Sequence, residues 1–198
     1  GTSGRVRVGM IDVAAVTHFP DQLRDFRASR PDVDLTLAVA PSGVLIEQVA
    51  ASDLDLAVCV DPPEPPPGVT VEPLLSESLF VFAPPGTSFP ATRDRWGPWV
   101  LFPEGSHTRL DVERRLREWG VDVEVAAESH QPDVLREMVL LGLGWTVLPS
   151  SQSGGGELVT GERVLDRDLV LVRRTTAVTD PAATDLATLL RTPDPEPA

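Results

Sequence analysis

The sequence predicts an α/β fold made of two Rossmann-like lobes, on the strength of three observations. The chain has 198 residues, of which 41% are hydrophobic, and a chain of this length buries roughly 70% of the surface that it exposes when unfolded. Strand and helix patterns alternate along it, which is typical of parallel strands joined by right-handed crossovers. The alternation also occurs twice, on either side of a proline-rich connection at 61–68. We therefore expect two lobes in series.

The first run of elements has the order β-α-β-α-β. A valine-rich alternation predicts a strand over 5–11, and 12–16 is expected to be a loop. A helix is expected from Thr17, which can cap it, with Pro20 in the first turn and Pro31 as the stop. The run continues with a strand, a helix and a strand, expected at 33–39, 42–51 and 54–60.

The second run follows the connection 61–68, whose prolines can neither continue a helix nor donate ladder hydrogen bonds. Two separate strands are expected first, at 70–74 and 79–83. Strand, turn and helix then repeat, at 99–102 with 109–119 and at 121–127 with 133–141. Three further elements are expected, a strand at 145–148, a strand at 168–173 and a final helix at 181–190.

Composition excludes several classes of function. Thirty acidic residues against 17 basic ones give a net charge of −13, and such a chain repels phosphate backbones, so we expect no DNA binding by this chain alone. The longest uncharged apolar run, 139–149, is much shorter than the roughly 20 residues of a membrane-spanning helix. The first residues lack the basic and apolar regions of a signal peptide. We expect a cytoplasmic protein with no membrane contact.

Two further features of the composition bear on chemistry and source. The single cysteine, Cys59, cannot form an internal disulfide and lies in an apolar run, so we expect a buried, inert thiol. All basic residues are arginine, and the sequence contains no lysine, asparagine or tyrosine. This usage fits the codon bias of a bacterial genome rich in G and C.

Residue patterns for catalysis or metal binding do not stand out. His18, His107 and His130 have no cysteine or acidic partners at the spacings of zinc ligands. The triplet 154–156 lacks the lysine and hydroxyl residue of a phosphate-binding loop. We therefore expect no enzyme activity, no metal and no cofactor.

Polar residues do gather at one kind of position. Ser42, 106–108 and 129–131 each fall between the carboxyl end of a strand and the first turn of a helix, where open α/β sheets bind their ligands. Unpaired N–H groups and a partial positive charge at helix N-termini would suit an anionic or polar small molecule. The alternative is that each residue only caps its helix.

The order of several motifs resembles the effector-binding domain of LysR-type transcriptional regulators. The first half carries them at Arg7-Val8-Gly9, Phe19-Pro20, Phe26, Arg30-Pro31-Asp32-Val33-Asp34-Leu35 and Leu54-Asp55-Leu56-Ala57-Val58. The second half carries them at 79–84 (LFVFAP) and 142–149 (GLGWTVLP). The resemblance covers essentially the whole chain. Nothing before Gly4 corresponds to the family's winged helix-turn-helix, so we interpret the chain as the isolated regulatory domain.

The resemblance implies a type 2 periplasmic-binding-protein fold with two lobes joined by two crossing strands. Lobe I would comprise 1–75 and 177–198, and lobe II 76–176. A small-molecule effector would bind in the cleft between them, and no bond would be broken. The resemblance also implies a homodimer, possibly a homotetramer in the full-length protein, in which the helix at 17–29 of one subunit packs against the helix at 108–119 of the other. DNA would be bound only through the domain that this chain lacks.

Carried over by position, the resemblance assigns an effector pocket to the first loop, to the start of the second helix and to two turns of lobe II. Its residues would be Val13, Ser42, Ser106, Thr108, Leu110, His130, Gln131 and Pro132. The family commonly has serine or threonine at the first-loop position, and Val13 with Ala14 and Ala15 makes that wall apolar. An apolar or amphipathic effector therefore competes with a carboxylate held by paired hydroxyls, and a domain that responds to no effector is a further alternative.

Alternatives from other classes are an enzyme or a solute-binding protein on the same two-lobed fold, or an oligomerisation module that needs no effector. An enzyme should show a clustered acid, base or nucleophile, and a solute-binding protein should carry a secretion signal. We find neither pattern, so ligand sensing for transcription is the preferred interpretation.

Overall fold

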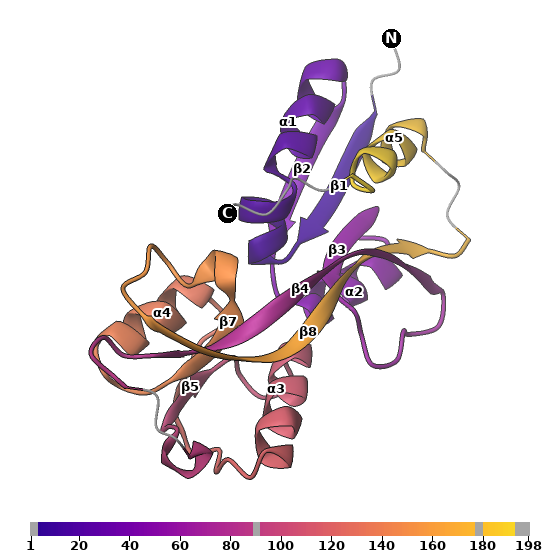
Figure 1. Ribbon diagram of the computed structural model, residues 1–198. Coiled ribbons are helices and arrows are strands. Elements are labelled where there is room, and N and C mark those ends of the chain that lie inside the picture. Colours follow the sequence, from indigo (N-terminus) through magenta and orange to yellow (C-terminus); the bar gives the residue numbers. More distant parts are fainter. Residues whose placement is uncertain (1–3, 89–91, 177–179, 193–198) are drawn as a thin grey trace. The chain divides into compact units, whose positions relative to one another are not determined.

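The computed structural model describes residues 4–88, 92–176 and 180–192 (Figure 1). The chain divides into two compact units. Unit 1 comprises the residues up to Ser76 and those from Asp168 onward, and unit 2 comprises Glu77–Arg167. The sequence placed these divisions after 75 and after 176.

Unit 1 contains the β-α-β-α-β run. Its elements are β1 (Arg5–Met10), the π-helical turn η1 (Ala14–His18), α1 (Pro20–Ser29), β2 (Asp34–Val39), α2 (Ser42–Ala50), β3 (Leu56–Val60) and α5 (Pro181–Leu189). β1 pairs in parallel with β2 on one side and with β3 on the other, as the alternation predicted. β8 (Val159–Arg174) follows β3 in the sheet and is antiparallel to it.

The segment before α1 differs from the expectation. Residues 14–18 form a helical turn rather than a loop, and Phe19, not Thr17, is the N-cap of α1. Phe19 makes no side-chain cap. The helix begins at Pro20 because proline fixes a helical φ and has no N–H to leave unpaired. Phe19 is fully buried, so packing rather than capping chemistry sets this boundary.

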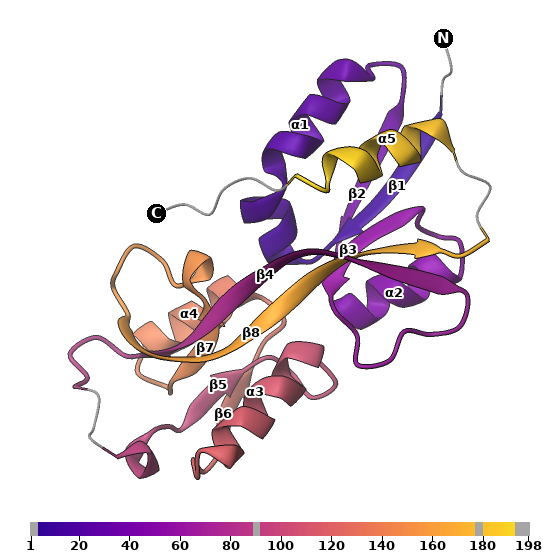
Figure 2. The same cartoon turned by 45° about the vertical axis from the view of Figure 1, so that its right-hand side comes forward.

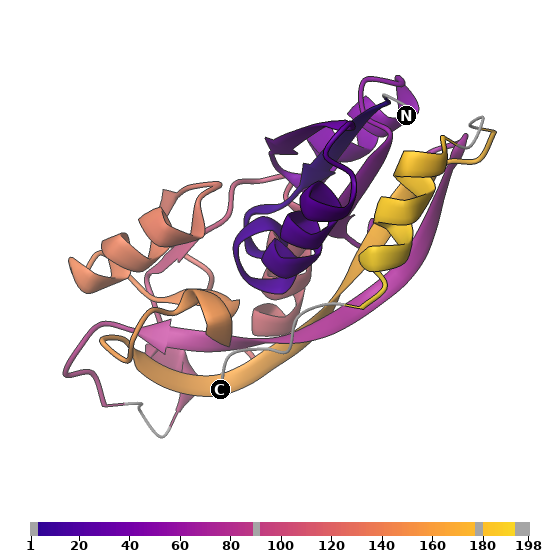
Figure 3. The same cartoon turned by 90° about the horizontal axis from the view of Figure 1, so that it is seen from above.

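The core of unit 1 is one continuous apolar cluster. α1 and α5 pack side by side, and α5 also contacts β1 (Figure 2 and Figure 3). α2 packs against β1 and β3. Gly9 faces α2, since a Cβ there would meet Leu45 at 2.6 Å. Every residue of β3 is buried, as expected of a central strand covered on both faces.

Unit 2 contains the two strand-turn-helix repeats. Its elements are η2 (Arg93–Arg95), β5 (Trp99–Leu101), α3 (His107–Glu118), β6 (Val125–Glu128), α4 (Pro132–Leu140), β7 (Thr146–Pro149) and η3 (Ser150–Gln152). β5 pairs in parallel with β6, and β7 pairs antiparallel with β4 (Val69–Ala83). A bridge between Trp99 and Trp145 places β7 beside β5.

Unit 2 has two smaller apolar clusters instead of one. One contains Val112 and Leu116 of α3, and the other contains Leu135 and Val139 of α4. Strand residues alternate between them, so that Leu101 joins the α3 cluster and its neighbour Val100 joins the α4 cluster. The four tryptophans of the chain, 96, 99, 119 and 145, all lie on the α3 side.

Two strands are much longer than the sequence suggested. β4 runs without interruption over Val69–Ala83, where two strands were expected, and β8 runs over Val159–Arg174, where only 168–173 was expected. The polar stretch around Ser76 and Ser78 looked like a break, but backbone pairing does not require apolar side chains. Partners therefore keep these residues in the sheet, as when the Ser78 hydroxyl donates to Asp166 at 2.6 Å.

Candidate functional site

Unit 2 brings two of the predicted turns together. β5 and β6 are parallel, with Leu101 opposite Glu128, so the turns that follow them lie at the same edge of the sheet. The Ser129 N–H donates to the Leu101 carbonyl at 3.2 Å. α3 begins after the first turn and α4 after the second. The polar residues that the sequence singled out in unit 2 thus share one edge.

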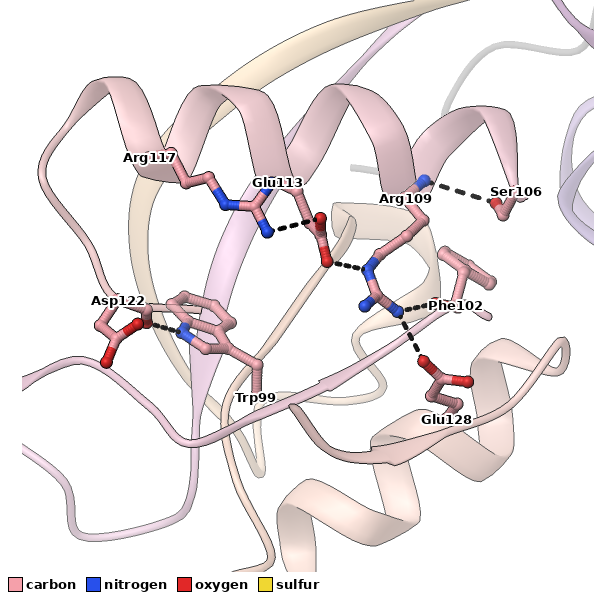
Figure 4. A network of polar contacts seen from close by, with 8 residues as sticks. All are labelled: Trp99, Phe102, Ser106, Arg109, Glu113, Arg117, Asp122 and Glu128. Carbon is pink, nitrogen blue, oxygen red and sulfur yellow. Dashed lines mark hydrogen bonds and ion pairs between the residues drawn. The ribbon is translucent and has the colours of Figure 1, made fainter. Parts of the chain in front are cut away.

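A buried arginine ties these two turns to each other (Figure 4). Arg109 is 5% exposed, and its Nη1 donates to the Phe102 carbonyl at 2.6 Å and to Glu128 Oε1 at 2.9 Å. Its Nε donates to Glu113 Oε1 at 2.6 Å. Burial lowers the pKa of Arg109, but the bonds to Glu128 and Glu113 more than offset this and raise it. The guanidinium is therefore a permanent cation.

The first turn of α3 holds three of the predicted residues in three different environments. Ser106 is the N-cap, and its Oγ accepts a bond from the Arg109 N–H at 3.4 Å. Thr108 is buried, and its Oγ1 accepts a bond from Arg167 Nη1 at 2.9 Å. Leu110 is 51% exposed. Ser106 fits the capping alternative, whereas Thr108 makes a contact that capping does not explain.

The first turn of α4 holds the other three predicted residues of unit 2. His130 and Gln131 are exposed, and Pro132 is buried as the first residue of the helix. The local hydrogen bond is made by Ser129, whose Oγ accepts from the Gln131 N–H at 3.1 Å. Gln131 is the N-cap residue but makes no side-chain cap.

Unit 1 holds the remaining two predicted residues, Val13 and Ser42. Val13 is 1% exposed and belongs to the apolar core. Ser42 is the first residue of α2, and its hydroxyl does not cap the helix. Instead Ser42 Oγ accepts a bond from the N–H of Val60, the last residue of β3, at 3.0 Å. The hydroxyl retains a proton to donate.

Hydrogen-bond donors dominate the turn before α3. The N–H groups of His107 and Thr108 lie in the first helical turn, where no intrahelical carbonyl reaches them. The hydroxyl proton of Thr108 adds a third donor, and the helix N-terminus adds a partial positive charge. This arrangement suits a ligand oxygen that accepts hydrogen bonds.

Sequence reasoning missed four charged residues around this turn, Glu77, Arg109, Glu128 and Arg167. Arg109 and Glu113 stand four residues apart on a predicted helix, a spacing that indicates a side-chain pair. Glu77 and Arg167 are 90 positions apart in the chain and form a buried ion pair at 2.7 Å. No local pattern in the sequence could reveal that pair.

The described residues also bear on the classes of site that the sequence disfavoured. Within residues 4–88, 92–176 and 180–192, no three histidine, cysteine or acidic side chains are arranged so that they could hold a metal ion. In the same residues, none of the helices has the length and apolar character needed to cross a bilayer.

Comparison with known proteins gives a single family. Residues 1–193 match the LysR substrate binding domain. The chain is 28% identical over 154 residues to the HTH-type transcriptional regulator YofA of Bacillus subtilis, covering 78% of this chain and 53% of YofA. It is 31% identical over 169 residues to the RuBisCO operon transcriptional regulator of Acidithiobacillus ferrooxidans, with coverage of 80% and 53%. The chain thus spans about half the length of these regulators.

Solved structures agree with the fold. The cofactor-binding domain of the Cbl transcriptional regulator superposes with a TM-score of 0.83 at 17% identity, covering 96% of this chain and 88% of that one. The effector binding domain of QuiR in complex with shikimate gives a TM-score of 0.82 at 17% identity, with 96% of each chain covered. The regulatory domain of CcmR from Synechocystis in complex with 2-PG gives 0.81 at 22% identity, with 95% and 96% covered.

These matches confirm the type 2 periplasmic-binding-protein fold that the resemblance implied. The curated relatives are transcriptional regulators. The chain belongs to the LysR family of transcriptional regulators and is its substrate-binding, or effector-binding, domain.

Proposed function

We propose that this domain senses an amphipathic small molecule and thereby controls the transcriptional activity of the regulator to which it belongs. An acceptor oxygen of the effector would bind at the turns of unit 2, and its apolar part would lie against Leu110, which is 51% exposed in the first turn of α3. The residues in contact would be Ser42, Ser106, Thr108, Leu110, His130, Gln131 and Pro132, whereas Val13 is buried in the core of unit 1 and drops out of the predicted set.

The observation that carries this proposal is the pair of adjoining turns in unit 2. One buried cation, Arg109, bonds to both turns, and the first N–H groups of α3 have no intrahelical carbonyl to bond to. Relatives of the same fold support the class of ligand, since QuiR and CcmR were solved with the small molecules shikimate and 2-PG.

A ligand screen tests the proposal. We would record thermal unfolding of the domain with shikimate, with 2-PG and with a panel of amphipathic carboxylic acids and their neutral amides. Ligands that bind the folded state raise the unfolding temperature by mass action. We expect at least one acid to stabilise the domain and its amide to do so less. If no compound of the panel binds at millimolar concentration, the proposal of an effector of this class is wrong.

Calorimetric titration of the best acid then tests Ser42. We expect Ser42→Ala to weaken its binding several-fold to tenfold, because one hydrogen bond contributes about 0.5–1.5 kcal/mol. The matched control is Ser29→Ala in α1, which removes a hydroxyl bonded to the Asp25 carbonyl at 2.8 Å and should leave affinity unchanged. Equal affinities of the wild type and Ser42→Ala would remove Ser42 from the site.

We also propose that the domain forms a homodimer through α1 and α3, as in the resemblance. Large side chains that the sequence offered for this contact prove to serve their own units, since Phe19, Phe26 and Leu116 are at most 1% exposed. Exposed apolar surface in unit 1 includes Leu37 and Val39 on the edge strand β2, which are 41% and 55% exposed. Exposed edge strands favour association.

Sedimentation velocity at tens of micromolar tests the dimer. We expect the wild type to sediment as a dimer and Val39→Glu to shift it toward the monomer. Leu141→Glu is the control, because Leu141 is 77% exposed but lies at the end of α4, outside the proposed contact. A wild type that is strictly monomeric would contradict the proposal.

DNA recognition would reside outside this domain. The net charge of −13 opposes a polyanion, so we expect no discrete, salt-tolerant complex with DNA in a gel-shift assay of the isolated domain. Such a complex at submicromolar concentration would overturn this part of the proposal.

A further inference from the structure

A buried ion pair between Glu77 and Arg167 contacts the first turn of α3. Glu77 is 2% exposed and Arg167 is 7% exposed, and Arg167 Nε donates to Glu77 Oε1 at 2.7 Å. The same guanidinium donates through Nη1 to Thr108 Oγ1 at 2.9 Å. One side chain thus connects β4, β8 and α3 inside unit 2.

Stability does not explain this pair. Removing two charges from water costs several kcal/mol per ion, and apolar side chains of similar volume usually serve a core as well or better. Unit 2 also has apolar clusters on both faces of its strands. A role in placing a particular group is the more specific explanation, and Thr108 is the group that the pair contacts.

Hydrogen-bond chemistry defines what the pair does to Thr108. A guanidinium can only donate, so Thr108 Oγ1 must accept the bond from Arg167. The single hydroxyl proton is then directed away from Arg167. Thr108 is the second residue of α3, so no carbonyl of a preceding helical turn can accept this proton, and no bond from it to another described residue is found.

The geometry points to Glu77 and Arg167 as positioning residues of the effector site: they hold the Thr108 hydroxyl as a donor toward the ligand. Glu77 fixes the guanidinium, the guanidinium fixes the hydroxyl, and the hydroxyl adds to the N–H groups of the same turn. The pair thereby makes the turn selective for ligand oxygens that accept hydrogen bonds. This inference rests on the proposed function, since it assumes that an effector meets this turn.

Glu77 and Arg167 are also the first and last residues of unit 2. β4 enters unit 2 at Glu77 and β8 leaves it at Arg167. Thr108 is therefore bonded directly to Arg167 on β8 and, through that guanidinium, linked to Glu77 on β4. A ligand that binds the Thr108 hydroxyl binds a group attached directly to one connecting strand and indirectly to the other.

Acetate is the probe for the test, with acetamidinium as a donor of matched shape. We would titrate each into the isotope-labelled domain at constant ionic strength and follow the backbone amide signals of His107, Thr108 and Arg109. The key variant combines Glu77→Met with Arg167→Met, which removes the pair without leaving an unpaired buried charge and without changing the net charge. Thr108→Val and the triple variant complete a double-mutant cycle.

We expect acetate to shift these amides saturably in the wild type, and acetamidinium not to do so. Removal of the pair should weaken acetate binding about tenfold, and so should Thr108→Val, but the triple variant should bind no more weakly than Thr108→Val alone. The matched control is Arg163→Gln with Asp166→Asn, an exposed pair on β8, which should leave acetate binding unchanged.

The outcomes separate the inference from the proposed function. If acetate binds the pair-removed variant as tightly as the wild type, or if the two losses add in the triple variant, Glu77 and Arg167 do not act through Thr108 and the inference is wrong. If acetate causes no saturable shift in the wild type, the turn itself is not a site and the proposed function is contradicted there. Well-dispersed amide spectra of all variants establish that each is folded.

Discussion

Units 1 and 2 have similar elements, but their cores differ in the number of apolar clusters and in the charge of their buried polar residues. Unit 1 has one continuous apolar cluster, and its buried polar residues, His18, Gln22 and Ser42, carry no permanent charge. In unit 2 the apolar residues form two clusters, and three buried charged residues lie among them, Glu77, Arg109 and Arg167. The core of unit 1 therefore contains no side chain with a permanent charge among the residues described, whereas unit 2 has buried charged groups, which cost folding free energy, near the turns where a ligand would bind.

The largest effect should come from breaking the buried pair of unit 2. Glu77→Ala leaves the Arg167 cation buried without its partner, and such losses cost about 3–5 kcal/mol of unfolding free energy. Glu77→Met combined with Arg167→Met should recover most of that loss. Urea unfolding followed by tryptophan fluorescence reports on unit 2 specifically, because all four tryptophans lie there. A double variant as unstable as Glu77→Ala would contradict this explanation.

Two matched glycine-to-alanine substitutions compare the cost of adding a methyl group in each unit. A Cβ on Gly144 in unit 2 would meet the Pro98 carbonyl oxygen at 2.5 Å, and backbone cannot move aside easily. A Cβ on Gly9 in unit 1 would meet only the ends of the Leu45 and Leu54 side chains, at 2.6 Å. Overpacking costs about 1–3 kcal/mol, so we expect Gly144→Ala near the upper end of that range and Gly9→Ala near the lower. Thermal unfolding of both variants measures the two losses of stability. A larger loss for Gly9→Ala than for Gly144→Ala would contradict this expectation.

The ion pairs of unit 1 should have smaller effects that depend on pH. Asp55 accepts bonds from the Arg7 side chain and backbone, at 2.9 Å and 2.8 Å. Burial raises the pKa of Asp55, but these bonds lower it more, so the net shift is downward. Its stabilisation is therefore present above the unfolded-state pKa of about 3.9 and is lost as the pH falls through the lower folded-state value.

We expect Asp55→Asn to lower the unfolding free energy by about 1 kcal/mol at pH 7, with the difference from wild type shrinking below about pH 4. Urea unfolding of both proteins between pH 7 and about pH 3 measures this difference in unfolding free energy. Asp34→Asn is the control, because Asp34 forms an exposed pair with Arg5 and should change stability little at any pH. A cost of Asp55→Asn that stayed constant down to pH 3 would contradict the assignment.

Cys59 should show no measurable reactivity in the folded domain. Burial raises the pKa of this thiol to about 12, so thiolate is scarce at neutral pH. We expect a thiol reagent to label the native domain far more slowly than the urea-unfolded chain. Rapid labelling of the native domain at pH 7 would show that β3 opens locally.

The sequence predicted most of the fold because its elements carry local signals. Periodicity and prolines predicted α1, α2, α4 and α5, whose bounds differ from expectation by a few residues at most. The errors arise where tertiary contacts override local patterns. β4 continues through its polar centre because its backbone stays paired, and Phe19 precedes α1 as a buried side chain although Thr17 is the better cap.

The candidate site was predictable only in its outline. Strand-to-helix turns can be recognised from a pattern, and the structure joins the two turns of unit 2 as parallel strands require. The charged residues behind those turns cannot be recognised in this way. Glu77 and Arg167 meet only because β4 and β8 both pass behind α3, and that proximity depends on the folded topology.

A crystal structure of the domain with the tightest-binding acid from the screen would show whether the effector meets the Thr108 hydroxyl. We expect an acceptor oxygen of the ligand within hydrogen-bonding distance of Thr108 Oγ1, with Arg167 Nη1 still donating to the same hydroxyl. A bound acid that makes no contact with residues 106–110, or a Thr108 released by Arg167 and bonded to backbone instead, would contradict this expectation.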